Sequence, residues 1–354
     1  MSTNVYFATN RARSGDGSLP SHYAGEAGPP GAPSPELTFG LAIVSQPDLG
    51  RLTTGSLLSL GSISGQALDA GVEAEIAQPG RNLLVFVHGF ANSFTDSITR
   101  AAFNRDWFAA AGPASANCAV VAFSWPSQGK SVDPGDIAGG TATLFLSLAV
   151  LALTGQVQSP FANAYRSDQA AAKGSAQAII SFLDRMQGVF QQVRSGGGRV
   201  ILLAHSMGNR AMQYALQRWA TMGSLPDLLF DEAISAAADT DWAEGNFSPA
   251  WLTALARSSR RLSLYHSAAD DILRLSQVVN GLQRLGRSGP PGIADATLFP
   301  PATIRFVDCS ALTDIGPNGG VDVSHQYYRR VRPVRDDIAL TMGGGGAPGR
   351  SVLA

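Results

Sequence analysis

The clearest chemical pattern in the chain is VILLAHSMG at residues 200–208. An uncharged apolar run of strand length leads directly to Ser206, and helical periodicity follows it. A serine at such a junction lies on a tight turn, so the residues two before and two after it must be small; Ala204 and Gly208 meet this requirement. The pattern favours a nucleophilic serine, with the backbone N–H of Met207 facing a developing oxyanion. A serine that only caps the helix is the alternative.

A second turn of interest follows the apolar run LLVFVHGF at residues 83–90. In folds with a nucleophilic serine of this kind, the loop after an earlier apolar strand supplies the second N–H that binds the oxyanion. A strand that ends in His-Gly, well before the serine in the chain, is typical of this position. Gly89 lets the backbone bend, and the N–H of Phe90, or as a weaker alternative that of Ala91, would complete the oxyanion hole. We interpret His88 as a structural residue that fixes this loop through its side chain.

A nucleophilic serine needs a base. In folds that carry such a serine on a tight turn between a strand and a helix, the chain order is Ser, then Asp or Glu, then His. Two histidines follow Ser206. His266 lies at the end of an apolar run and is interpreted as structural. His325 lies in the polar stretch VDVSHQYY, after the last expected strand and before an expected C-terminal helix. We therefore predict that His325 is the base.

The acid that orients this base is expected just after a strand. The run RLSLYHS leads into AADDILRLS, which places Asp270 a short turn beyond the strand and at the start of the next helix. Asp271 is its neighbour, and one of the two could orient His325 while the other caps the helix. Asp239, in SAAADTDW after the preceding strand, is the other alternative acid. Asp270 fits the expected position best.

The elements that must carry these residues alternate along the chain. Short apolar runs of strand length are separated by stretches with helical periodicity, which predicts a mostly parallel sheet covered by helices on both faces. The expected strands are at 83–87, 119–123, 200–204, 229–235, 262–265 and 304–307, and the expected helices at about 165–194, 208–222 and 270–285. Shorter strands are expected near the N-terminus, in VYFATNR and at residues 37–44.

One apolar segment does not fit this alternation. Residues 137–165 contain no charged side chain, and their centre reads TATLFLSLAVLAL. Because a membrane-spanning helix needs about 20 apolar residues, and because this segment falls between two strands of one sheet, we do not expect it to span a bilayer. We expect it to be a cap that covers the active site; an additional core helix and a flap that touches lipid are the alternatives.

Composition excludes several other classes of protein. The 354 residues carry 26 Lys and Arg against 27 Asp and Glu, a net charge of −1, which argues against nucleic acid and against a polybasic membrane surface as partners. Cys118 and Cys309 are too few for a disulfide framework, and the five histidines show no zinc-binding spacing, so we expect no metal and no other cofactor. The N-terminal residues contain no apolar signal sequence, which makes the cytoplasm the expected location.

Together these motifs resemble the α/β-hydrolase superfamily. More narrowly, the ordered set YFATNR, FVHGFANSFTDSITRAA, FSWPSQG, LLAHSMGNR, SAAADTDW, LYHSAADDILRLS and SHQYY resembles a bacterial α/β-hydrolase-like family catalogued as a domain of unknown function. The resemblance covers about residues 83–330 well and the N-terminus loosely. It implies a serine hydrolase with Ser206, His325 and Asp270 as its catalytic triad, but it implies no particular substrate.

The sequence thus predicts a hydrolase of small-molecule carboxylic esters, acting through an acyl-enzyme on esters with an apolar acyl group. A lipase or phospholipase in peripheral contact with a membrane, and a catalytically silent interaction module of the same fold, are the rival interpretations. The expected organisation is an N-terminal extension at 1–80, a hydrolase domain at 81–342 with a cap insertion at 130–165, and a flexible tail at 343–354. The sequence carries no signal of a particular oligomeric state.

Overall fold

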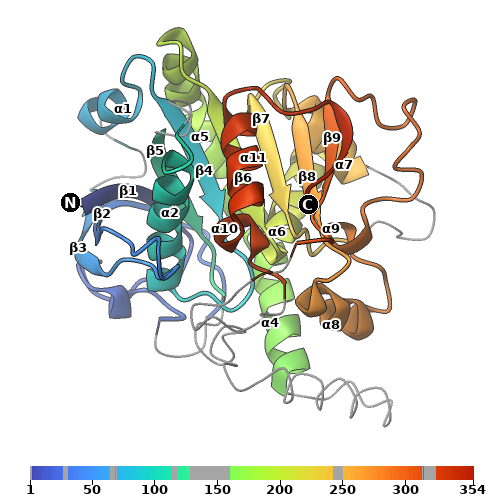
Figure 1. Ribbon diagram of the computed structural model, residues 1–354. Coiled ribbons are helices and arrows are strands. Elements are labelled where there is room, and N and C mark those ends of the chain that lie inside the picture. Colours follow the sequence, from blue (N-terminus) through green and yellow to red (C-terminus); the bar gives the residue numbers. More distant parts are fainter. Residues whose placement is uncertain are drawn as a thin grey trace.

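The protein is built around one large β-sheet (Figure 1). The structure is a computed structural model, and it describes residues 2–26, 31–63, 68, 70–112, 118–127, 160–241, 250–312, 314 and 324–354. The strands are β1 (Ser2–Thr9), β2 (Thr38–Ser45), β3 (Leu57–Ile63), β4 (Asn82–Val87), β5 (Cys118–Ser124), β6 (Val200–His205), β7 (Glu232–Ala236), β8 (Leu262–His266), β9 (Ile304–Asp308) and β10 (Gly349–Val352).

The order across the sheet is β10-β9-β8-β7-β6-β4-β5-β1-β2-β3. Pairing is parallel from β10 to β1, and antiparallel between β1 and β2 and between β2 and β3. The N-terminal strands therefore extend the same sheet rather than form a separate layer. Because β4, β6, β7, β8 and β9 run in parallel, the loops that follow them meet at one edge of the sheet, where such folds bind ligands.

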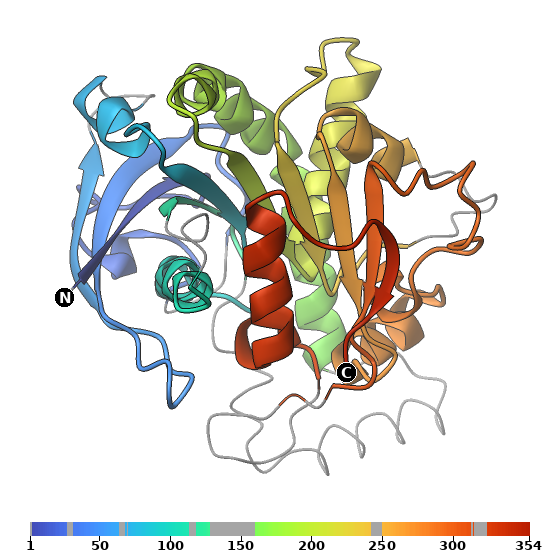
Figure 2. The ribbon, with the colours of Figure 1, turned by 45° about the horizontal axis from the view of Figure 1, so that its top comes forward.

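Helices cover both faces of the sheet (Figures 1 and 2). The helices are α1 (Ala70–Ile76), α2 (Phe94–Ala109), α4 (Pro160–Gly174), α5 (Ala176–Ser195), α6 (Met207–Thr221), α7 (Ala250–Arg257), α8 (Asp271–Asn280), α9 (Leu285–Ser288), α10 (Tyr327–Arg330) and α11 (Arg332–Met342), with a 3₁₀ turn at Pro20–His22. Figure 2 shows α2 and α11 on one face, and α5 and α6 on the other. The fold is thus the α/β arrangement that the sequence predicts.

Alternate residues of the central strands belong to two separate hydrophobic cores. In β4, Leu83 and Val85 pack into the core beneath α5 and α6, whereas Leu84 and Phe86 pack into the core beneath α2 and α11. All four side chains are buried. This double burial explains why the strand sequences are continuously apolar instead of alternating.

The expected strands at the sheet centre are all present, with small shifts at their ends. The helix expected at about 165–194 is two helices, α4 and α5, which are separated at Ser175; its hydroxyl donates to the carbonyl of Ala171 (2.8 Å). The helix expected at 270–285 ends earlier, at Asn280, because Gly281 adopts a left-handed conformation (φ 69°) that terminates it. Most of the apolar segment at 137–165 lies outside the described residues; its last residues, 160–165, begin α4.

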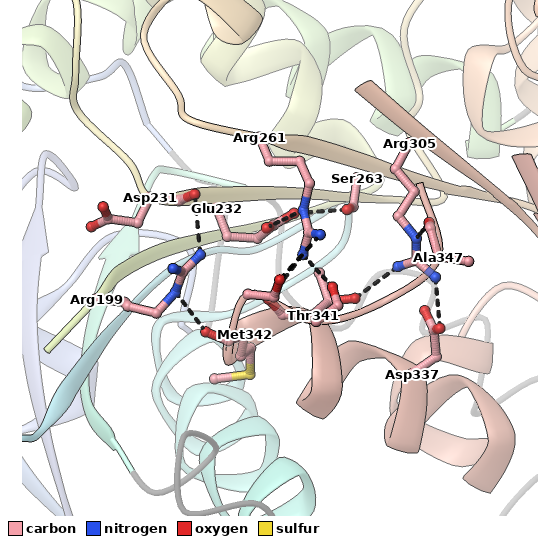
Figure 3. A network of polar contacts seen from close by, with 12 residues as sticks. Arg199, Asp231, Glu232, Arg261, Ser263, Arg305, Asp337, Thr341, Met342 and Ala347 are labelled. Atoms are coloured by element: carbon pink, nitrogen blue, oxygen red, sulfur yellow. Dashed lines mark hydrogen bonds and ion pairs between the residues drawn. The ribbon is translucent and has the colours of Figure 1, made fainter. Parts of the chain in front are cut away.

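The C-terminal residues differ from the expected flexible tail, because residues 349–352 form β10 beside β9. Arginines at the starts of neighbouring strands hold the chain that leads to it (Figure 3). Arg261 donates to the Gly345 carbonyl (2.6 Å), and Arg305 donates to the Ala347 carbonyl (2.7 Å). These donors satisfy carbonyls of a glycine-rich segment that has few side chains to pack. The tail is therefore ordered by distant residues rather than by its own sequence.

The same group of residues attaches α11 to the sheet (Figure 3). Arg305 also pairs with Asp337 of α11 (2.7 Å), and Arg199 donates to the Met342 carbonyl at the end of the helix (3.0 Å). These contacts lie at the amino ends of the strands, which is the edge opposite to the loops that follow β6 and β8. Among the helices that the structure describes, none is both long enough and apolar enough to cross a membrane.

Candidate active site

Ser206 lies at the junction between β6 and α6, as the sequence predicts. Its backbone has φ 53° and ψ −124°, a conformation that is unfavourable for a residue with a side chain. Its N–H donates to the carbonyl of Ala236 in β7 (3.0 Å), and its carbonyl accepts the N–H of Asp239 (3.1 Å). β7 and the loop that follows it thus hold both the N–H and the carbonyl of the serine, which keeps the strained conformation in place.

Two glycines make this turn possible. A Cβ atom on Gly208 would lie 2.5 Å from the carbonyl oxygen of Val87, so only glycine fits where α6 starts beside β4. A Cβ atom on Gly89 would lie 2.8 Å from the Cβ of Ser206. The loop after β4 and the turn after β6 therefore touch each other at the serine, as a nucleophile and an oxyanion donor would require.

Asn209 stabilises the same turn from within the helix. Its side-chain amide donates to the carbonyl of Ala204 (2.9 Å), and its side-chain oxygen accepts the hydroxyl of Ser235 (2.7 Å). All three residues are buried. Asn209 is a site residue that the sequence motifs did not identify; its place three residues after the serine, in the first turn of α6, is the signal that could have identified it.

Asp270 and His325 form a direct hydrogen bond. His325 Nδ1 lies 2.7 Å from Asp270 Oδ2, and both side chains are buried. Asp270 Oδ1 also accepts the N–H of Leu273, so this one residue both contacts the histidine and caps α8. The expectation that Asp270 and Asp271 would divide these two tasks is therefore wrong. Asp271 instead pairs with Arg274 on the same helix (3.6 Å).

Aromatic side chains hold the loop that carries His325. Tyr327 donates its hydroxyl to the Tyr265 carbonyl at the end of β8 (2.9 Å) and accepts the N–H of Ala237 beyond β7 (3.1 Å). The ring of Tyr328 packs against the ring of His205, with 4.5 Å between ring centroids. The SHQYY motif therefore supplies the histidine together with the two tyrosines that fix its backbone.

Asp239, the alternative acid, has different partners. Its carboxylate accepts the hydroxyls of Tyr165 (2.7 Å) and Ser276, and it lies 3.8 Å from the Arg284 guanidinium. Arg284 is fully buried and also pairs with Asp241. Asp239 thus belongs to a buried charge network beside the serine turn, whereas the contact with His325 is made by Asp270.

The loop after β4 contains the two candidate oxyanion donors. The N–H of Ala91 donates to the carboxylate of Asp168 on α4 (3.2 Å), which commits it to a structural bond. Phe90 therefore remains the preferred donor beside Met207. The Phe90 ring contacts the ring of Tyr165 (5.7 Å between centroids), so the first turns of α4 lie beside this loop. The loop ends at Ser93, which forms a reciprocal capping box with Asp96 at the start of α2.

The other histidines have the surroundings of structural residues. His88 stacks on Trp125 (5.0 Å between centroids), and its Nδ1 donates to the Gly89 carbonyl (2.9 Å). His266 lies at the end of β8, 4.0 Å from Asp308. Burial lowers the pKa of both rings, that of His88 well below its usual value, which keeps His88 neutral. Both cysteines are buried free thiols.

Electrostatics at the site follow from burial. Burial raises the pKa of Asp270, although the bond to His325 opposes this effect. A buried Asp carboxylate that contacts the imidazole and also accepts the Leu273 N–H is suited to stabilise the imidazolium. Burial also holds the pKa of His205 well below its usual range, so its ring is neutral. The described residues include no group of three or more His, Cys, Asp and Glu side chains that could hold a metal ion.

Three features together define the α/β-hydrolase class: a mostly parallel sheet with helices on both faces, a strained serine between a strand and a helix, and a histidine–aspartate pair beyond later strands. A family described as "Alpha/beta hydrolase of unknown function (DUF900)" matches residues 65–331, and the chain belongs to this family. The resemblance inferred from the motifs is thereby confirmed. No curated protein and no solved structure matches the chain.

Proposed function

We propose that the protein is a serine hydrolase that cleaves carboxylic esters through an acyl-enzyme intermediate. The observation that carries this proposal is the 2.7 Å contact between His325 Nδ1 and Asp270 Oδ2, at the sheet edge where Ser206 occupies its strained turn. A histidine fixed in this way presents its other nitrogen, Nε2, as an acceptor for a proton. Ser206, His325 and Asp270 are the proposed nucleophile, base and acid.

The first half-reaction forms the acyl-enzyme. His325 Nε2 takes the proton of Ser206 as Oγ attacks the carbonyl carbon of the ester, and the carbonyl oxygen becomes an oxyanion. The N–H groups of Met207 and Phe90 stabilise that charge, which such donors do by about 10²- to 10³-fold in rate. The carbon–oxygen bond to the alcohol then breaks, and the alcohol leaves with the proton from His325.

The second half-reaction reverses these proton movements with water. His325 removes a proton from a water molecule as its oxygen attacks the acyl carbon, and the same N–H groups hold the new oxyanion. The intermediate then releases Ser206, which recovers its proton from His325, and the carboxylic acid departs. Throughout, Asp270 keeps Nδ1 protonated and stabilises the transient imidazolium.

An apolar acyl group is the proposed substrate feature. Its support is the uncharged composition of residues 137–165 and the contact of Tyr165, at the end of that segment, with Phe90. Each methylene that such a surface buries would contribute about 0.8 kcal/mol to binding.

The test is a series of p-nitrophenyl esters with acyl chains from short to long, hydrolysed by the wild type and by Ser206→Ala. Activity of the wild type that Ser206→Ala lacks, together with labelling of Ser206 by a fluorophosphonate, would support the proposal. A sharp rise in rate above the micellar concentration of the substrate would favour a lipase instead. If the wild type hydrolyses no ester and takes no label, the result would contradict the proposal and favour a silent interaction module.

A further inference from the structure

Arg11 of the YFATNR motif is fully buried, and its guanidinium binds the backbone around the oxyanion loop. Nη2 donates to the carbonyl of Asn92 (2.8 Å), and Nη1 donates to the carbonyls of Ala24 (2.8 Å) and Ser127 (3.2 Å). Nε donates to the hydroxyl of Ser124 at the end of β5 (2.9 Å). One side chain from the N-terminal strand region thus joins the loop after β4 to the end of β5.

Asp168 holds the same loop from the side of α4. Its Oδ2 accepts the N–H of Ala91 (3.2 Å) and the hydroxyl of Ser127. The Ser127 hydroxyl oxygen in turn accepts the N–H of Asn92 (3.2 Å). Asp168 is fully buried, like Arg11. Two consecutive loop residues are therefore fixed through their backbone N–H groups, and the second of them also through its carbonyl.

The loop needs such support because of its backbone conformation. Ala91 has φ 54°, a left-handed value that costs free energy for a residue other than glycine. Asn92 adds contacts within the loop, where its side-chain amide donates to the Phe90 carbonyl (2.7 Å) and to the Gly89 carbonyl (3.1 Å). The peptide unit that contains the Phe90 N–H is thus held through its Gly89 carbonyl, and the next unit through the Phe90 carbonyl and the Ala91 N–H.

Arg11 and Asp168 carry opposite charges. Burial lowers the pKa of Arg11 to about 10, and Asp168 is the leading charge that opposes this shift, so Arg11 stays cationic at neutral pH. A planar guanidinium with donors in fixed directions suits several carbonyls at once, which the single ammonium of lysine cannot match. A buried charge is costly unless its hydrogen bonds are satisfied, so this arrangement fixes the backbone atoms that satisfy it.

We infer that Arg11 and Asp168 are positioning residues that hold the loop at 89–92 so that the Phe90 N–H faces the oxyanion. The inference rests on the proposed function. Neither side chain is assigned a contact with reacting atoms; both act through the backbone of the loop. A displacement of about 1 Å in such a group can lower a rate by about 10²-fold.

The variants Arg11→Lys, Arg11→Met and Asp168→Asn test this inference. Each should lower kcat for the best p-nitrophenyl ester by about 10- to 100-fold and leave KM within about threefold, because a misdirected oxyanion donor weakens the transition state and not the bound ester. Arg11→Lys keeps the charge, but its kcat should stay below half of the wild-type kcat, because lysine lacks the other donors of the guanidinium. The matched control is Asn10→Ala: the neighbouring residue is also buried, but its side chain bonds to Ser175 and not to the loop. It should leave kcat unchanged.

Two readouts separate positioning from a general loss of structure. A trifluoromethyl ketone, whose adduct with serine is an oxyanion, should bind the variants about 10- to 100-fold more weakly, in parallel with kcat. Hydrogen exchange at the Ala91 and Asn92 amides should accelerate in Arg11→Lys and Asp168→Asn but not in Asn10→Ala.

The inference is overturned if Arg11→Lys and Asp168→Asn keep wild-type kcat, or if they lower only thermal stability. If the wild type hydrolyses no ester and Ser206 takes no label, the proposed function fails. In that case the exchange of the two loop amides still decides whether Arg11 and Asp168 hold the loop.

Discussion

His205 Nε2 lies 3.1 Å from the backbone carbonyl oxygen of His325. The residue that precedes the proposed nucleophile therefore holds the backbone of the proposed base, across 120 positions of sequence. Because burial keeps the His205 ring neutral, one of its nitrogens carries a proton, and the contact with a carbonyl assigns that proton to Nε2. The relative position of serine and histidine thus depends on a third side chain, which in the sequence is visible only as part of the serine motif.

Replacing His205 by phenylalanine should therefore impair catalysis more than stability. The ring shape is retained, but the donor to the His325 carbonyl is lost, so we expect kcat to fall about 10-fold or more and the free energy of unfolding to fall by about 1 kcal/mol. His205→Gln restores an amide donor of similar reach and should recover part of kcat. Steady-state kinetics and urea unfolding of both variants provide the measurement. Equal kcat in the Phe and Gln variants would contradict this role.

Substitutions at Ser206 should separate strain from chemistry. Both Ser206→Ala and Ser206→Gly should abolish hydrolysis, because neither has a nucleophile. Ser206→Ala should leave the free energy of unfolding within about 1 kcal/mol of the wild type. Glycine adopts φ 53° without a Cβ clash, so Ser206→Gly should be about 1 kcal/mol more stable than Ser206→Ala. Urea unfolding measures the difference, and a less stable glycine variant would show that the turn is not strained.

Asp270→Asn should lose activity and keep the fold. The amide cannot stabilise an imidazolium, and in a related triad this change lowered kcat by about 10⁴-fold. Asparagine is as good a helix cap as aspartate, so the bond from Leu273 N–H should persist and the stability change should be small. Asp271→Asn is the matched control and should leave kcat nearly unchanged.

Asp239→Asn should show the opposite pattern. It weakens the ion contact with buried Arg284, so we expect a loss of about 3 kcal/mol in stability and a smaller loss in kcat than in Asp270→Asn. Kinetics and unfolding of the two variants can be compared side by side. A larger fall in kcat for Asp239→Asn than for Asp270→Asn would identify Asp239, in the loop after β7, as the acid that orients His325.

The central sheet was predictable because its strands are buried on both faces and are therefore mostly apolar along their length. The serine turn was predictable because its geometry allows only small residues at 204 and 208. The contact between His325 and Asp270 was predictable from their places after the last strands. These signals are local: each depends on a few consecutive residues.

The remaining features depend on contacts between distant residues, and no local pattern reveals them. Arg11 appears in the sequence as one residue of a motif, and only the fold brings it to the Asn92 carbonyl. Asp168 is one carboxylate among many on helical stretches, and its burial against Ala91 has no periodic signature. The order of the C-terminal residues arises in the same way, from arginines at the starts of other strands.

Glu232 is the first residue of β7 and lies far from the proposed catalytic edge. Burial raises the pKa of its carboxyl to about 7, against the opposing effects of Arg261 and the Ser263 hydroxyl. Between about pH 4.5 and pH 7, the folded chain therefore keeps a proton on Glu232 that the unfolded chain has lost. The contribution of Glu232 to stability is complete below pH 4.5 and is lost as the pH rises toward 7, by up to about 1.4 kcal/mol per pH unit.

Glu232→Gln should remove this dependence. Between pH 5 and 7, the slope of its free energy of unfolding against pH should therefore be more positive than that of the wild type, by up to about 1.4 kcal/mol per pH unit, which corresponds to one proton. Asp231→Asn is the matched control. Burial acts to raise the pKa of Asp231, but the Val200 N–H and Arg194 outweigh it and hold the pKa below its usual value, so Asp231 stays ionised in both folded and unfolded chains over this range. Urea unfolding at half-unit pH steps measures the slopes. Identical slopes for the wild type and Glu232→Gln would mean that Glu232 is ionised in the folded protein throughout, and that its bond to Arg261 outweighs its burial.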